Sequence, residues 1–247
     1  MKKTNYSYIG IAFIILVFGI IFIPKIIDRI SNDDVIRNES RSDYVDDEKS
    51  TSSDLAFIEI NGDPKKVPPF SFINQDGITI TNKDYEGKVY LVEFFFTTCP
   101  TICPRMNANL VRIQNTFKNF ENFGVASFTI NPDYDTPEVL KSYAEQYGVT
   151  NPNWHLMTGN KEAIYKLSNE GFNLYTAEEE NVVGGFEHSG NFALIDKNGF
   201  IRSRKDKFGN PIIYYRGMIP ESEKVDDEGV EEEISILKED IKKLLNE

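Results

Sequence analysis

Apolar residues occur along this chain in two spacings that indicate different elements. The run 89–96 is apolar or aromatic at every position except one glutamate. Its β-branched and aromatic content predicts a strand buried on both faces. The run 124–130 predicts the next core strand, and the shorter runs 154–157 and 191–196 predict two more. These four segments are expected to form the centre of a sheet.

Helix signals separate the strands. Thr136 and Pro137 fit the N-cap and first position of a helix that ends before Gly148. A second helix is expected over 161–170, ended by Gly171. The final helix carries apolar residues on one face at Ile234, Leu237, Ile241 and Leu244. Strands alternating with helices predict an α/β sandwich.

Shorter segments are expected at the edges of this sheet. Residues 57–88 alternate in polarity around glycines typical of turns and predict an N-terminal hairpin. Residues 172–187 are expected to form a loop or hairpin insertion, and 200–216 a pair of edge strands around Gly209.

The N-terminus is strongly apolar. Residues 8–23 contain no charge, and at about 1.5 Å per residue they span about 24 Å, slightly less than a bilayer core of about 30 Å. Isoleucines that follow can extend the span, and no small-residue cleavage site is present. We therefore predict an uncleaved transmembrane signal anchor over 1–30, a flexible acidic linker over 31–56 and a folded domain over 57–247.

Charge is unevenly distributed. Of the net charge of −12, residues 31–54 contribute −5 and residues 221–247 contribute −7, so the rest of the chain is neutral. We interpret both runs as solvated sequence, a linker and a tail outside the folded core, rather than as metal-capture segments. Nothing is basic enough to indicate nucleic-acid binding.

The chain has two cysteines, Cys99 and Cys103, directly after the run 89–96. Pro104 suits a first helical turn, and the apolar positions that follow continue a helical spacing. Positions i and i+4 of a helix lie about 5–6 Å apart, which suits two thiolates on one metal ion or, after a small adjustment, a disulfide with Cβ atoms about 3.8 Å apart. A purely structural disulfide is disfavoured, because a loop of three residues barely restricts the unfolded chain.

A histidine is the expected third partner of the two cysteines. His188 lies in a glycine-rich segment just before the strand 191–196, whereas His155 lies inside an apolar run and is expected to be a packed structural residue. Two thiolates and one imidazole favour Cu(I) and also accept Cu(II) or Zn(II). A structural zinc site usually has a fourth protein ligand, which this sequence does not offer near the cysteines.

The segments 94–107 and 128–140, and His188 before 192–196, resemble the Sco/SenC family, above all in the Cys-Pro-Thr-Ile-Cys-Pro motif. The resemblance implies a thioredoxin-like domain held at the cytoplasmic membrane by a single span and facing the periplasm. It implies copper ligands at Cys99, Cys103 and His188. It also implies copper delivery to the dinuclear centre of cytochrome c oxidase, with the copper-bearing subunit or another copper protein as partner.

One position departs from the family pattern. Asn131 stands where the family often has an aspartate, while Asp135 keeps the second acidic position. If Asn131 faces the metal, a carboxylate that could tune the site is lost. The set of three expected ligands is unchanged.

A thiol-disulfide oxidoreductase acting on extracytoplasmic proteins is the alternative, with Cys99 and Cys103 as a redox pair that forms a disulfide when oxidised. The segment Gly190-Asn191 lacks the proline that thioredoxin-like reductases carry before the facing strand, and such a reductase has no use for His188 as a ligand. Copper delivery is therefore favoured, although one site can serve both activities. A peroxiredoxin-like peroxidase is a weaker third interpretation.

Overall fold

A computed structural model describes residues 16–18, 20, 23–24, 55–60, 62–179 and 184–247. The chain forms two compact units, Met1–Ser40 and Arg41–Glu247. In the first, the described residues are helical, and none of the described helices is long and apolar enough to cross a bilayer. Most of the expected anchor, all but residues 16–18, 20 and 23–24, and nearly all of the expected linker lie outside the described residues.

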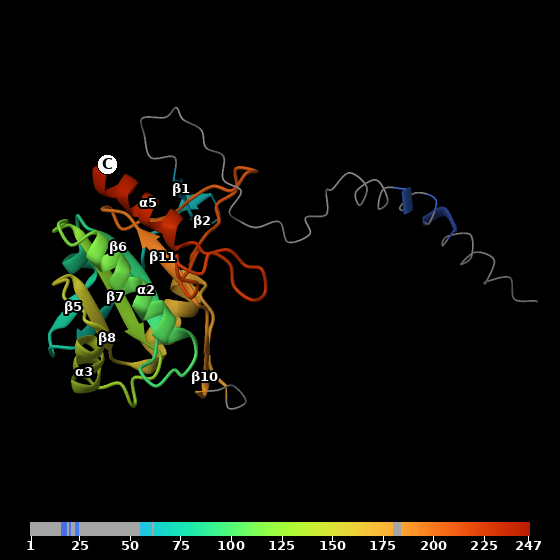
Figure 1. The fold of residues 1–247 in the computed structure, drawn as a ribbon. Helices are drawn as coiled ribbons and strands as arrows, with labels where there is room; N and C mark the ends of the chain where they lie inside the picture. The colour runs from blue at the N-terminus through green and yellow to red at the C-terminus, as the bar shows by residue number, and fades with distance from the viewer. Residues whose placement is uncertain (1–15, 19, 21–22, 25–54, 61, 180–183) are drawn as a thin grey trace, which may run out of the picture. The chain divides into compact units, whose positions relative to one another are not determined.

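The second unit is built on a mixed sheet (Figure 1). Its strands, together with those of two small hairpins, are β1 (Ala56–Phe57), β2 (Glu59–Ile60), β3 (Asp63–Pro64), β4 (Ser71–Asn74), β5 (Thr79–Thr81), β6 (Val89–Phe95), β7 (Phe123–Thr129), β8 (Trp154–Thr158), β9 (Thr176–Glu178), β10 (Phe186–His188), β11 (Asn191–Ile195), β12 (Ile201–Ser203) and β13 (Tyr215–Arg216). The helices are α2 (Ile102–Thr116), α3 (Pro137–Tyr147), α4 (Lys161–Lys166) and α5 (Ile234–Asn246).

The sheet order is β1-β12-β11-β6-β7-β8-β4-β5, and β13 also pairs with β11. The strands β6, β7 and β8 are parallel, with Val92 opposite Ala126 and Ala126 opposite His155. On the other side of β6, β11 runs antiparallel and places Ala193 opposite Val92. The predicted α/β class, core strands and N-terminal hairpin (β4–β5) are therefore confirmed.

The central strand β6 is buried along its whole length because both of its faces are covered. On one face, the Phe94 ring stacks on Phe128 at 5.4 Å and meets Phe172 edge-on at 5.8 Å. On the other face, Phe95 contacts Tyr143 of α3 at 5.6 Å between ring centroids. The helices α2 and α3, which contact one another, lie in front of the sheet in Figure 1.

Local signals account for most helix ends. Thr136 caps α3 by accepting a hydrogen bond from the Val139 amide at 3.4 Å, and Gly148 ends it with a left-handed φ of 77°. The expected end at Gly171 is wrong, because α4 continues into a π-helical turn, Leu167–Phe172, that ends at Asn173 with φ of 52°. Asparagine tolerates this left-handed conformation better than most residues.

The C-terminal acidic run belongs to the fold, and its interpretation as a solvated tail is wrong. Asp240 and Glu233 are 0% and 1% exposed. Asp240 pairs with Arg204 at 2.7 Å, and Glu233 pairs with Arg216 at 3.3 Å. Both arginines lie before residue 221, Arg204 just after β12 and Arg216 in β13, so a charge count over 221–247 alone misses them.

One carboxyl group in the core has few hydrogen-bond partners. Glu93 of β6 is 0% exposed, and its Oε1 accepts a hydrogen bond from the Ser127 hydroxyl at 2.6 Å. Its Oε2 has no hydrogen-bond partner among the described residues. Burial raises the pKa of Glu93 to about 7, since the charged form loses its hydration.

We expect Glu93→Gln to change how stability depends on pH. The pKa of Glu93 in the folded state lies above its value in the unfolded chain. Its favourable contribution to the free energy of unfolding is therefore fully present at low pH and is lost as the pH rises toward 7. Between pH 5 and pH 8 the variant should gain roughly 2–3 kcal/mol relative to the wild type. Urea unfolding at both pH values measures this, with exposed Glu145→Gln as control. The same pH dependence in the wild type and in Glu93→Gln would contradict the assignment.

Candidate metal centre

The cysteines lie where β6 passes into α2. Cys99 follows the end of the strand, and its amide donates to the Phe96 carbonyl at 3.2 Å. Cys103 is the second residue of α2, so its sulfur lies at a helix N-terminus, where the dipole favours negative charge. Both cysteines are reduced in the structure.

The histidine comes from a separate element. His188 is the last residue of β10, which among the described strands pairs with β9 alone. This hairpin lies where an insertion is expected over 172–187. The His188 Nε2 lies 3.3 Å from the Cys103 Sγ, across 85 residues of sequence. The potential ligand atoms of Cys99, Cys103 and His188 all lie within 4.8 Å of one another, the one such group found among the described residues.

Apolar residues lie against His188 and the cysteine loop. The Phe96 ring meets His188 edge-on at 5.8 Å and contacts Phe186 at 5.0 Å. A Cβ added at Gly184 would lie 3.1 Å from both Phe96 and Pro100, so the hairpin backbone lies directly against the cysteine loop. Cys103 is 0% exposed and Cys99 7% exposed, which leaves Cys99 nearer to solvent.

The two thiols differ in acidity. Hydrogen bonds to its sulfur, the largest from Cys103 and a smaller one from His188, hold the pKa of Cys99 well below its usual range, although burial opposes this. The same bond between the sulfurs, together with burial, raises the pKa of Cys103. The pKa shifts therefore make Cys99 the more acidic of the two thiols. Two neighbouring sulfurs of this kind suit a soft cation.

A buried carboxylate fixes the cysteine loop. Asp135 is 0% exposed and accepts hydrogen bonds from the Thr97 amide at 3.1 Å and from the hydroxyls of Thr97 and Thr129. Asp135 thus connects the end of β6, two residues before Cys99, to the end of β7. The sequence shows only that position 135 is acidic. Its hydrogen-bond partners Thr97 and Thr129 cannot be identified from sequence, because they reach Asp135 only when the ends of β6 and β7 lie side by side.

Asn131 begins the loop that carries Asp135. Its amide donates to the Thr129 hydroxyl at 3.0 Å, and its carbonyl accepts from the Asp135 amide at 2.9 Å. These contacts involve only the main chain of Asn131, and the residue is not part of the Cys-Cys-His group.

His155 lies away from this group, on β8. Its Nδ1 is 3.2 Å from the Asn74 side-chain nitrogen, and its ring meets Tyr85 edge-on at 5.8 Å. Burial lowers the pKa of His155. These contacts fit the packed structural role expected for it.

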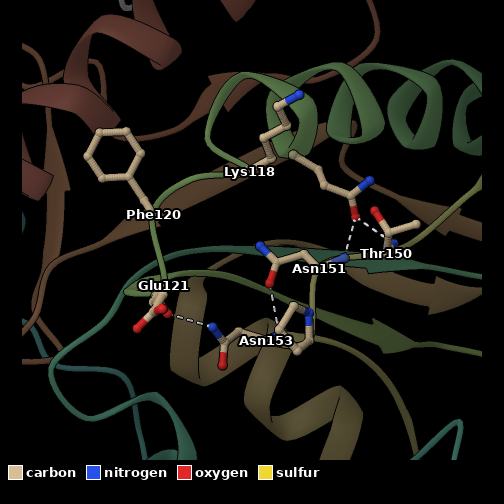
Figure 2. A pocket seen from close by; sticks show the side chains of 8 residues that line it. Lys118, Phe120, Glu121, Thr150, Asn151 and Asn153 are labelled. Carbon is tan, nitrogen blue, oxygen red and sulfur yellow. Dashed lines mark hydrogen bonds between the residues drawn. The ribbon is translucent and has the colours of Figure 1, made fainter.

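A depression of about 490 Å³ lies beside the C-terminal end of α2 (Figure 2). Its polar groups are used within the fold: Gln114 Oε1 accepts from the amides of Thr150 and Asn151, and the Asn153 side chain donates to the Glu121 carbonyl. The cysteines lie at the other end of this helix, so the depression is not part of the centre.

Comparisons with known proteins agree with these observations. A sequence model described as SCO1/SenC matches residues 59–218. A SCO1 protein homolog of Bacillus subtilis is 34% identical over 140 residues, which cover 54% of this chain and 70% of that protein. A SCO2-like protein of Rickettsia prowazekii is 34% identical over 142 residues, 53% of this chain and 64% of that protein.

Two solved structures are similar over most of the folded unit. A SCO1/SenC family lipoprotein from Bacillus anthracis has a TM-score of 0.60 at 31% identity, covering 73% of this chain and 95% of that one. BsSco, described as a member of the Sco family of cytochrome c oxidase assembly proteins, has a TM-score of 0.57 at 25% identity, covering 74% and 94%. The fold is thioredoxin-like, as predicted, and the chain belongs to the SCO1/SenC family.

Proposed function

We propose that this protein is a copper chaperone that holds one copper ion on Cys99, Cys103 and His188 and delivers it to the dinuclear copper centre of cytochrome c oxidase. The observation that carries the proposal is the convergence of two sulfurs and one imidazole nitrogen within 4.8 Å. This soft donor set suits copper. A putative copper-binding protein of Stutzerimonas stutzeri, 28% identical over 141 residues, is consistent with this, as is the description of BsSco as an oxidase assembly protein.

The geometry suggests how copper enters and leaves. Cys99 is the less buried of the two cysteines and has the lower pKa, so it would make the first sulfur contact with incoming copper. Binding then displaces the proton of Cys103, and His188 completes a three-coordinate site. A ligand from the partner would replace His188 or Cys99 first, because these are less buried than Cys103, which would release the metal last.

The same cysteines support thiol-disulfide exchange as a second candidate function. The Cys99 thiolate would attack a disulfide of a client protein, and Cys103 would then displace the client sulfur, leaving a Cys99–Cys103 disulfide and two client thiols. The contrast in acidity between the two thiols favours this chemistry. A disulfide switch is described for BsSco.

We also propose that residues 1–30 anchor the chain in the cytoplasmic membrane by one span, with 31–56 as a linker and 57–247 facing the periplasm. Support comes from the uncharged run 8–23 and the polar composition of the residues that follow. The description of the Bacillus anthracis relative as a lipoprotein is consistent with a membrane location.

His188→Ala separates the two candidate functions. Loss of one of three ligands should weaken copper binding by the purified, reduced full chain at least tenfold, roughly the cost of one charge-assisted contact. Reduction of a disulfide substrate should be largely unchanged, because thiolate attack requires only Cys99 and Cys103. Copper competition titrations and a disulfide-reduction assay on the same preparations measure both quantities.

Two kinds of variant serve as references. His155→Ala should bind copper like the wild type, and serine at either cysteine should abolish both activities. If His188→Ala kept wild-type copper affinity but lost reductase activity, the copper proposal would fail and the oxidoreductase would replace it.

Asp135→Asn should impair the centre without removing a ligand. The asparagine keeps the size of the side chain but cannot accept all three hydrogen bonds as a carboxylate does. We expect copper affinity to fall about tenfold, as for other residues that orient metal ligands, and the thiolate-to-Cu(II) absorption band to shift. Exposed Asp133→Asn, two residues away, is the matched control. An unchanged band and affinity in Asp135→Asn would show that Asp135 does not position the cysteines.

A further inference from the structure

The segment 217–218 contacts both parts of the chain that carry the proposed copper ligands. It directly follows β13, which pairs antiparallel with the start of β11. The Gly217 amide donates to the Gly190 carbonyl at 2.7 Å, and Gly190 comes two residues after His188. The segment is therefore bonded directly to the backbone that leads from the imidazole into the sheet.

The segment also packs tightly on the histidine side. A Cβ added at Gly190 would lie 2.7 Å from the Met218 Cγ, and one added at Gly217 would lie 2.6 Å from the Phe192 ring. That ring is 0% exposed, so it has little room to move aside. Closely packed interiors transmit displacements, and a shift of the segment is therefore passed on to the residues that follow His188.

Asn109 of α2 holds the segment from the cysteine side. It is 0% exposed, and its side-chain amide donates to the Gly217 carbonyl at 2.8 Å. Its Oδ1 accepts from Arg112 at 2.6 Å, which fixes the orientation of the amide. Asn109 and Cys103 belong to the same helix. Gly217 is thus bonded through its carbonyl to the helix that carries Cys103 and through its amide to the segment that follows His188.

Arg105 makes a second contact between α2 and the segment. Its Nε donates to the Met218 carbonyl at 3.1 Å, and its guanidinium pairs with Glu223. The side chains of Arg105 and Glu223 are each 48% exposed, and exposed ion pairs contribute little. The buried bond of Asn109 is therefore expected to be the stronger restraint on the segment.

We propose that Asn109 is a positioning residue that controls how closely His188 approaches Cys103, acting through the bonds Asn109–Gly217–Gly190. This role rests on the proposed copper function. The His188 Nε2 lies 3.3 Å from the Cys103 Sγ, yet the two residues belong to separate elements. The bridge through Gly217 ties these elements together without supplying a ligand itself.

Asn109 should matter more for Cu(II) than for Cu(I). Thiolates select Cu(I), whereas Cu(II) favours nitrogen and oxygen ligands. The two cysteines can therefore hold Cu(I) with the imidazole displaced, but Cu(II) depends on His188. Loosening the bridge is expected to reduce the affinity for Cu(II) selectively.

Asn109→Asp tests this role, because the aspartate keeps the size of the side chain and the bond from Arg112 but places an oxygen against the Gly217 carbonyl in place of an N–H donor. In the purified, reduced full chain, we expect the Cu(II) affinity to fall about tenfold, the lower end of the range for residues that orient metal ligands. The Cu(I) affinity should stay close to that of the wild type, and the thiolate-to-Cu(II) absorption band should shift. Competition titrations with each ion and visible spectra measure these quantities.

Asn109→Ser separates the loss of the bond from the added charge. Its side chain is one bond shorter, so it loses contact with the Gly217 carbonyl, and it stays neutral. It should show the same selective loss of Cu(II) affinity.

Gln114→Glu is the matched control, on the same helix but away from the centre. Gln114 is 2% exposed, its amide donates to the Gly148 carbonyl at 3.1 Å, and its Oε1 accepts from the Thr150 and Asn151 amides. The change therefore also replaces a buried donor to a glycine carbonyl by a carboxylate oxygen. Its copper affinities and absorption band should equal those of the wild type, even where urea unfolding shows a similar loss of stability in both variants.

The imidazole resonances of the metal-free, reduced chain test the positioning without copper. The chain contains two histidines, and His155, which lies away from the centre, serves as an internal reference. In Asn109→Asp and Asn109→Ser, the ring resonances of His188 should move from their wild-type positions while those of His155 stay. Gln114→Glu should leave both unchanged.

Wild-type His188 resonances or wild-type Cu(II) affinity in the two Asn109 variants would overturn the role of Asn109, as would a fall of Cu(I) and Cu(II) affinity by the same factor. Failure of the wild type to bind copper would instead overturn the proposed function, and the imidazole resonances would still decide the role of Asn109.

Discussion

The complete burial of β6 is the constraint on which the rest of the folded unit depends. The strand has β7 on one side and β11 on the other, and aromatic side chains cover both of its faces. A shift of its register by one residue would exchange its two faces and break the ring contacts of Phe94 and Phe95. Its carboxyl end therefore delivers Cys99 and the start of α2 to one place, next to the residues that enter β11. His188 lies three residues before that entry, which brings donors 85 residues apart into contact.

Buried charges hold the other side of the unit together. Arg202 pairs with Asp196 at 2.9 Å, and Arg204 pairs with Asp240 of α5 at 2.7 Å. The first pair joins β12 to the residue that follows β11, and the second connects α5 to the sheet just after β12. A pair of this kind contributes little net stability compared with apolar packing, but removal of one partner leaves an uncompensated charge and is costly. The acidic C-terminus is thus part of the framework that holds β11 and, through it, the histidine segment.

The sequence alone predicted the elements that local chemistry determines. The continuous apolar run made β6 recognisable, Thr136 and Pro137 marked the start of α3, and the cysteine spacing pointed to a soft metal site. Contacts between distant segments were not predictable in this way. The clamp formed by Asp135 and the pairing of Asp240 with Arg204 both depend on which elements are neighbours in the fold. The sequence places His188 in a glycine-rich segment before β11. In the structure His188 ends a strand of a separate hairpin. The sequence misses this strand because residues 176–178 give little sign that they pair with 186–188.

X-ray absorption at the copper edge of the loaded, reduced full chain tests the central claim most directly, because it reports the atoms bonded to the metal. The account predicts two sulfur scatterers and one nitrogen scatterer per copper, from Cys99, Cys103 and His188. The nitrogen contribution should disappear in His188→Ala and persist in His155→Ala. A copper environment made only of oxygen and nitrogen, or one unchanged by loss of His188, would contradict it.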